Sequence, residues 1–87
     1  MASYDLKWKS SAQRELNKLP QPIIADLVQL TEGLKENPYP PGVKKMQGTK
    51  STWRIRRGDY RVIYTVINNI LTIEIVRVGH RQSVYDA

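Results

Sequence analysis

The 87-residue sequence predicts a single α+β domain, residues 1–87, with the element order β-α-α-β-β-β. Three observations lead to this fold class. Residues 3–8 alternate apolar and polar side chains, residues 10–36 carry apolar side chains at helical spacing, and residues 52–78 alternate again between turn signals. Three successive strands with short connections form an antiparallel meander, and the apolar stripes of both helices would cover one of its faces.

The first 20 residues predict a strand and a short helix. Residues 3–8 place three large apolar side chains at alternate positions: Tyr4, Leu6 and Trp8. Ser10 and Gln13 match a capping box, in which both side chains would bond to backbone amides at the start of a helix. Pro20 would end this helix, because proline cannot donate a helical hydrogen bond.

A second helix is expected from Pro22, which suits a first helical position, to about Glu36. Its apolar side chains form one stripe: Ile23, Ile24, Leu27, Val28, Leu30 and Leu34. We interpret this stripe as core packing against the sheet, with a groove for a partner as the alternative. Residues 37–50 are rich in Pro, Gly and Lys and are predicted to form a connecting loop.

The three remaining strands are predicted with two short turns between them. In order they are residues 52–57, a turn at Gly58 and Asp59, residues 60–67, a tight two-residue turn at Asn68 and Asn69, and residues 70–78. Because strand side chains alternate between faces, Arg54, Arg56 and Arg61 would share the uncovered face with Arg81. The same alternation puts eight residues under the helices: Trp53, Ile55, Tyr60, Val62, Tyr64, Val66, Val76 and Val78. Ile63, Ile73 and Ile75 would fall on the arginine face, and a single bulge would break this assignment.

The positive charge lies entirely in the second half of the chain. Residues 1–42 hold five Lys or Arg and five Asp or Glu, whereas residues 43–87 hold nine against three, which accounts for the net charge of +6. Guanidinium forks match phosphate oxygens in pairs, so a basic sheet favours a phosphate-binding surface. Five further cations are candidates for RNA or ribosome contact: Lys44, Lys45, Lys50, Arg57 and Arg77. The alternative is surface charge that only keeps the protein in solution. Nearby carboxylates are few for so many arginines: Asp59, Glu74 and Asp86.

Several classes of protein are excluded or disfavoured by composition. The absence of Cys excludes disulfides and Cys-based zinc sites, and a single His disfavours a structural metal, so no metal or cofactor is expected. No apolar run approaches the ~20 residues of a membrane span, and the polar N-terminus does not read as a signal peptide. A cytoplasmic protein without a membrane partner is the expectation.

Two further side chains are candidates for chemistry. His80 is a possible general base, because neighbouring arginines would favour its neutral form, and a surface residue is the alternative. Tyr85 could stack on a base or donate a hydrogen bond to phosphate, or simply pack the end of the chain.

Three segments in this order resemble the RelE toxins of the RelE/ParE superfamily of toxin–antitoxin modules: residues 37–48, residues 53–64, and Val78-Gly79-His80-Arg81 with Val84-Tyr85. The resemblance implies a metal-independent mRNA endonuclease that acts in the ribosomal A site. In such enzymes the RNA 2′-hydroxyl attacks the adjacent phosphorus, leaving a 2′,3′-cyclic phosphate and a 5′-hydroxyl. It also implies mRNA, the ribosome and a co-encoded antitoxin as partners, with operator DNA bound only through the antitoxin.

The resemblance also assigns roles to individual residues. Arg61 matches the arginine that steadies the scissile phosphate, Arg81 the one that stabilises the transition state or protonates the leaving oxygen, and Tyr85 the tyrosine that orients the substrate. Arg54 and Arg56 stand where the best-studied branch carries lysines. Arginine does not lose its proton in proteins, so these two would act by electrostatics.

Two questions stay open at the level of sequence. His80 stands where that branch has a lysine, so the general base would be His80, ribosomal RNA or water. The alternative functions are a ParE-type toxin that poisons DNA gyrase, a non-catalytic RNA-binding module, and an inactive toxin retained to bind a protein.

Overall fold

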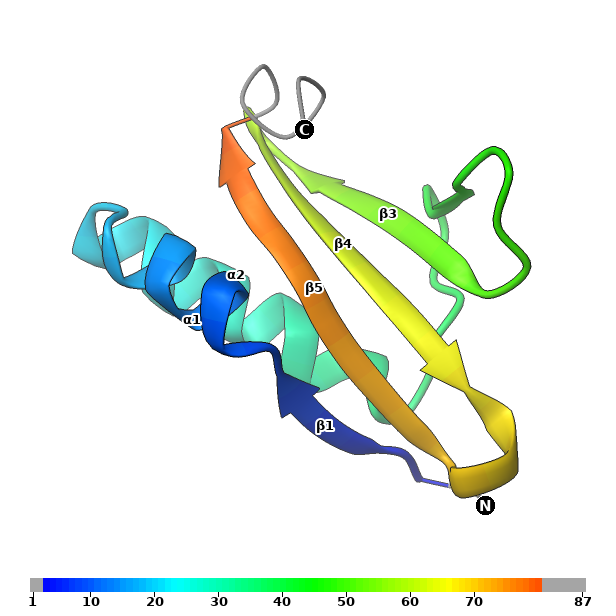
Figure 1. Ribbon diagram of the computed structural model, residues 1–87. Coiled ribbons are helices and arrows are strands. Elements are labelled where there is room, and N and C mark those ends of the chain that lie inside the picture. Colours follow the sequence, from blue (N-terminus) through cyan, green and yellow to red (C-terminus); the bar gives the residue numbers. More distant parts are fainter. Residues whose placement is uncertain (1–2, 81–87) are drawn as a thin grey trace.

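The computed structural model describes residues 3–80, which form two helices and one five-stranded sheet (Figure 1). The elements are β1 (Asp5–Trp8), α1 (Ser10–Asn17), α2 (Gln21–Leu34), β2 (Lys44–Lys45), β3 (Thr52–Arg57), β4 (Tyr60–Ile67), the 3₁₀ turn η1 (Asn68–Ile70) and β5 (Thr72–His80). The strand order is β1-β5-β4-β3-β2, with β1 parallel to β5 and all other neighbours antiparallel. The predicted α+β class and the antiparallel meander are confirmed.

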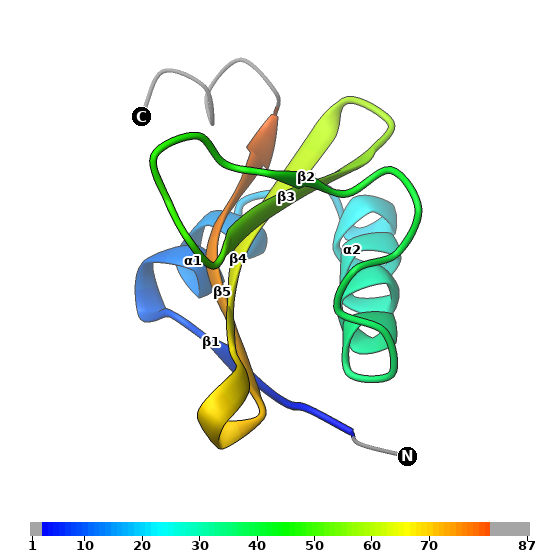
Figure 2. The same ribbon diagram turned by 90° about the vertical axis from the view of Figure 1, so that its right-hand side faces the viewer.

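Both helices contribute to a single core against the sheet. Figure 2 shows α2 on one side of the sheet, and α1 lies next to β5 in Figure 1. The side chains of the buried core cluster belong to both helices and to three strands: Ala12, Leu16, Leu27, Leu34, Ile55, Val62, Tyr64, Val66, Ile73, Ile75 and Val78. Ile63 is also buried but lies outside this cluster, consistent with its predicted place on the arginine face. Most of the apolar stripe of the second helix therefore packs in or against the core, as predicted. The prediction for Val28 is wrong, because this side chain is 39% exposed. Neither helix of residues 3–80 is long and apolar enough to cross a membrane.

A bulge on β5 changes which of its side chains face the core. Ile63 of β4 is opposite Arg77, but the next residue, Tyr64, is opposite Ile75, so Val76 is an extra residue on β5. One extra residue reverses the alternation of faces along a strand. Two residues predicted on the arginine face are consequently in the core: Ile73 and Ile75. The prediction for Val76 is also wrong, because this side chain is only half-buried and lies outside the core cluster.

Two local predictions near the chain turns are wrong as well. Ser10 is the first residue of α1 rather than its cap, and Lys9 occupies the cap position without a side-chain hydrogen bond. The β4–β5 connection is longer than a two-residue turn, and Leu71 adopts a left-handed conformation there with φ of 47°. The side chain of Asn68 accepts a hydrogen bond of 2.7 Å from the Tyr4 hydroxyl, a contact 64 residues apart that local sequence does not reveal.

The connector after α2 is fastened to the sheet by aromatic side chains. The hydroxyl of the buried Tyr64 donates a 2.6 Å hydrogen bond to the carbonyl oxygen of Pro38. Burial raises the pKa of Tyr64, so this hydroxyl stays protonated and remains a donor at neutral pH. The ring of Tyr39 lies edge-on to Trp53 with centroids 5.0 Å apart. These contacts fix the path by which the chain reaches β2.

Candidate active site

Three arginines meet on the face of β3 and β4 that lies opposite the core. Arg56 is directly opposite Arg61 across the two strands, and Arg54 lies two residues further along β3, opposite Ile63. Side chains two residues apart on a strand share a face, so the three guanidinium groups point to the same side. All three line one surface hollow of about 190 Å³. The predicted convergence therefore holds for Arg54, Arg56 and Arg61, whereas the fourth predicted member, Arg81, lies outside the described residues.

Among residues 3–80, every side chain that lines this hollow is cationic. Gly42 and Lys44 join the three arginines in this part of the lining. Arg61 is 7% exposed, whereas Arg56 is on the surface, so the hollow has a buried and an exposed wall. Several cations side by side are stable when an anion or water lies between them.

The two lysines of the short strand β2 point to opposite faces of the sheet. This segment was predicted as loop, but pairing with β3 makes it a strand, in which Lys44 is opposite Arg54 and Lys45 is opposite Trp53. Trp53 packs against the core. Lys44 therefore faces the hollow and Lys45 the other side of the sheet. Lys50 is exposed in the following loop and is not among the residues that line the hollow.

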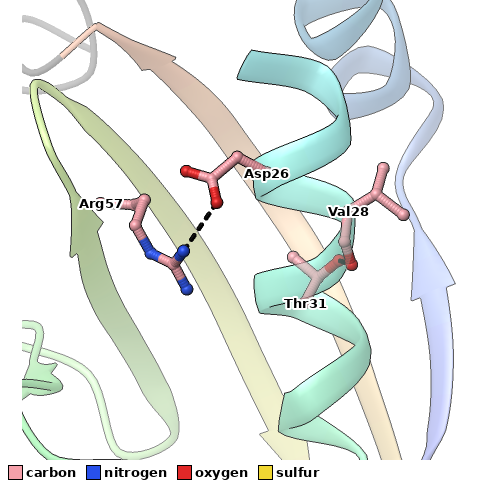
Figure 3. A network of polar contacts seen from close by, with 4 residues as sticks. All are labelled: Asp26, Val28, Thr31 and Arg57. Atoms are coloured by element: carbon pink, nitrogen blue, oxygen red, sulfur yellow. Dashed lines mark hydrogen bonds and ion pairs between the residues drawn. The ribbon is translucent and has the colours of Figure 1, made fainter. Parts of the chain in front are cut away.

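Two other arginines are paired with carboxylates from the helices. The Nη1 atom of Arg57 lies 2.7 Å from Oδ1 of Asp26 in α2 (Figure 3). The Nη2 atom of Arg77 lies 3.1 Å from Oε2 of Glu15 in α1. Glu15 also accepts a 2.9 Å hydrogen bond from the backbone N–H of Val78. The expectation that only carboxylates of the sheet and C-terminus would be available was wrong, because the helices supply these partners. Contact of Arg57 and Arg77 with RNA stays a prediction.

His80 is not among the residues that line the hollow. It is opposite Tyr60 in the sheet, and the two rings lie edge-to-face with centroids 5.8 Å apart. Tyr60 packs against the core, so this imidazole lies on the face opposite the three arginines. Arg81 and Tyr85 lie outside the described residues, and their predicted roles are untested.

Comparison with known proteins identifies the family. Residues 6–85 match the family of the ParE toxin of type II toxin–antitoxin systems, parDE. The toxin RelG of Mycobacterium tuberculosis is 34% identical over 83 residues, 94% of this chain and 95% of that protein, and the toxin RelE of the same organism is 31% identical over 94% of this chain and 86% of its own length.

Solved structures agree with this assignment. The toxin–antitoxin complex RelBE2 from Mycobacterium tuberculosis contains a chain of TM-score 0.82 and 32% identity, with 92% of this chain and 100% of that chain covered. The archaeal RelE–RelB complex from Pyrococcus horikoshii OT3 gives a TM-score of 0.81 at 30% identity, with 91% and 96% covered. The family match, the fold and these relatives together show that the chain belongs to the RelE/ParE superfamily and is a RelE-type toxin of a type II toxin–antitoxin system.

Proposed function

We propose that this toxin is an endoribonuclease that cleaves mRNA in the ribosomal A site and so stops translation. The observation that carries the proposal is the hollow on the uncovered face, where Arg54, Arg56 and Arg61 come together from two adjacent strands. A phosphodiester of RNA is the ligand that best matches such a group of guanidinium forks. The relatives named RelE and RelG toxins support the same function.

The proposed reaction needs positive charge around one phosphorus atom. Ribosomal RNA or water takes the proton of the ribose 2′-hydroxyl, and the 2′-oxygen forms a bond to the adjacent phosphorus. The bond between phosphorus and the 5′-oxygen breaks, and the 5′-oxygen takes up a proton from water. The products are a 2′,3′-cyclic phosphate and a 5′-hydroxyl. Negative charge grows on the phosphoryl oxygens in the transition state, and donors already in place stabilise it without reorganisation. Guanidinium groups can supply this stabilisation, so we propose a reaction without metal or cofactor.

The three arginines have different positions and therefore different proposed roles. Arg61 is held by burial, which suits the residue that fixes the scissile phosphate. Arg54 and Arg56 line the same hollow and would stabilise the transition state electrostatically, since neither can accept a proton. Of the two roles that the family resemblance implies for Arg81, stabilisation of the transition state is the one that an arginine can perform without losing its proton. Tyr85 keeps the implied role of orienting the substrate.

A cognate antitoxin is the proposed protein partner. Relatives of this chain have been solved in complex with RelB antitoxins. An acidic or amphipathic antitoxin segment laid over the sheet would cover the hollow and keep the toxin inactive. Operator DNA would be bound only through the antitoxin, and the toxin would act in the cytoplasm on translated mRNA. Co-expression of the adjacent small gene is expected to relieve toxicity.

Mapping of RNA ends after brief induction tests the proposed function. We expect new 2′,3′-cyclic phosphate and 5′-hydroxyl ends within translated messages, and loss of these ends when ribosomes are blocked. An Arg61→Ala toxin that is still folded should produce few such ends, because one lost donor typically lowers the rate by ~10²–10³. Growth arrest with intact mRNA would overturn the proposal.

The ParE family match keeps a second candidate function in view. A ParE-type toxin that poisons DNA gyrase would trigger DNA-damage signalling and leave mRNA uncut. A non-catalytic RNA-binding module would instead show salt-sensitive RNA binding without cyclic phosphate ends. The same induction experiment, with a DNA-damage reporter added, separates these outcomes.

A further inference from the structure

We propose that Lys44 is a fourth phosphate ligand of the arginine hollow and stabilises the transition state as a compact positive charge. The proposal deepens the proposed function, and its kinetic part rests on RNA cleavage. Its binding part concerns phosphate recognition alone and stands without it.

The position of Lys44 comes from the register of the sheet. Lys44 is opposite Arg54, which in turn is opposite Ile63, so these three residues form one row across β2, β3 and β4. Arg56 and Arg61 form the next row on the same face. The side chain of Lys44 lines the hollow together with the three arginines. It is the only member of this group that comes from β2, and so it approaches the hollow from the outer strand of the sheet.

Strand β2 is held in place by contacts that do not involve the Lys44 side chain. The backbone N–H of Met46 donates a 2.8 Å hydrogen bond to the carbonyl of Thr52. The Thr49 hydroxyl donates a 2.8 Å bond to the Met46 carbonyl, which closes the turn after β2. Before the strand, Gly42 has φ of 90°, a conformation that glycine adopts without strain. A substitution of the exposed Lys44 side chain therefore removes one charge and leaves the strand in place.

A lysine in the hollow contributes a compact positive charge on a flexible side chain, which the arginines do not provide. Guanidinium groups are planar forks and hold a phosphate in a fixed orientation. An ammonium group on a flexible stem can follow the charge that grows on the phosphoryl oxygens as the 2′-oxygen attacks. In this role Lys44 stays protonated throughout, so it transfers no proton and the balance of the cleavage step is unchanged.

Lys45 provides a matched control one residue away. Both lysines are exposed, both belong to β2, and each loses one positive charge on substitution by alanine. Only Lys44 faces the hollow, because Lys45 is opposite Trp53 on the core side of the sheet. A difference between Lys44→Ala and Lys45→Ala therefore reports position rather than net charge.

The test measures A-site mRNA cleavage in single turnover and, separately, the affinity of the free toxin for inorganic pyrophosphate by calorimetry. Lys44→Ala is expected to slow cleavage about 100-fold, the size typical of one lost donor, and to weaken pyrophosphate binding about tenfold, as expected for one charge-assisted hydrogen bond. Lys45→Ala should bind pyrophosphate as the wild type does, because Lys45 does not line the hollow, and Lys44→Arg should recover most of the pyrophosphate affinity. Equal losses of pyrophosphate affinity in Lys44→Ala and Lys45→Ala would overturn the proposal. If the wild type cleaves no RNA, the proposed function fails, and the pyrophosphate comparison still decides the role of Lys44.

Discussion

Replacement of Arg56 by Gln is expected to stabilise the fold while it slows RNA cleavage. Arg56 and Arg61 are directly opposite each other in the antiparallel pair β3–β4. Like charges at such positions are destabilising, with cross-strand pairs worth ~0.2–1 kcal/mol. Arg56 is exposed, and glutamine keeps most of its length, so the substitution loses little packing. The free energy of unfolding should therefore rise by up to about 1 kcal/mol.

The expected shift in melting temperature follows from the size of the domain. A change of 1 kcal/mol moves Tm by ~4–8 °C in a domain of 60–100 residues, so Arg56→Gln should raise Tm by roughly 1–8 °C. The difference between the two proteins should shrink in part as salt is added, because ions reach the exposed Arg56 but screen the buried Arg61 less. Single-turnover cleavage should fall by ~10², since one donor to the developing phosphoryl charge is lost. A lower Tm, or an unchanged cleavage rate, would refute the idea that these two arginines are held together for catalysis at a cost in stability.

Three further substitutions test other parts of the structure. Glu15→Ala should lower the free energy of unfolding by about 1–3 kcal/mol, because the N–H of Val78 and the guanidinium of Arg77 lose their acceptor. Glu15→Gln should recover part of this loss. Thermal melting measures the stability of each variant, and amide exchange at Val78 reports the lost hydrogen bond. His80→Gln should leave the cleavage rate and its pH profile close to wild type, because the imidazole contacts Tyr60 and does not line the hollow. A fall in the cleavage rate of ~10²–10⁴, the size typical of general-base catalysis, would contradict this geometry. Leu71→Asn should raise the free energy of unfolding by up to about 1 kcal/mol, because asparagine tolerates the left-handed backbone conformation better than leucine does. A lower Tm would show that the packing of the leucine side chain outweighs the strain in its backbone.

The alternation of side chains along β3 and β4 predicted the arginine hollow correctly. The reason is local: Gly58 has φ of 60° in the two-residue turn, and this turn places Arg57 opposite Tyr60 and so sets the whole register. Alternation on each strand then brings Arg56 opposite Arg61 without any further information. A short hairpin is the part of a sheet that sequence determines best, and here it carries the proposed site.

The same reasoning failed on β5, where one strict alternation was applied along the whole strand. The apolar residues change parity between Ile75 and Val76, and pairing with β4 shows that Val76 is the extra residue. The carboxylate partners of Arg57 and Arg77 were missed for a related reason. Asp26 and Glu15 are 31 and 62 residues away in the sequence, and their approach depends on how the helices pack. Contacts of this kind become visible only once the tertiary fold is known.

Arg57 and Arg77, which are paired with carboxylates of the helices, differ in how readily each could exchange its carboxylate partner for an RNA phosphate. The Arg57–Asp26 pair is exposed, with 43% and 38% of the two side chains accessible, and such pairs contribute ~0–1 kcal/mol. A phosphate could displace Asp26 at little cost. Glu15 is less exposed and binds the Val78 N–H as well as Arg77, so its removal would leave two donors without an acceptor. Of these two arginines, Arg57 is therefore the better candidate for RNA contact, and Arg77 is better suited to holding β5 against α1.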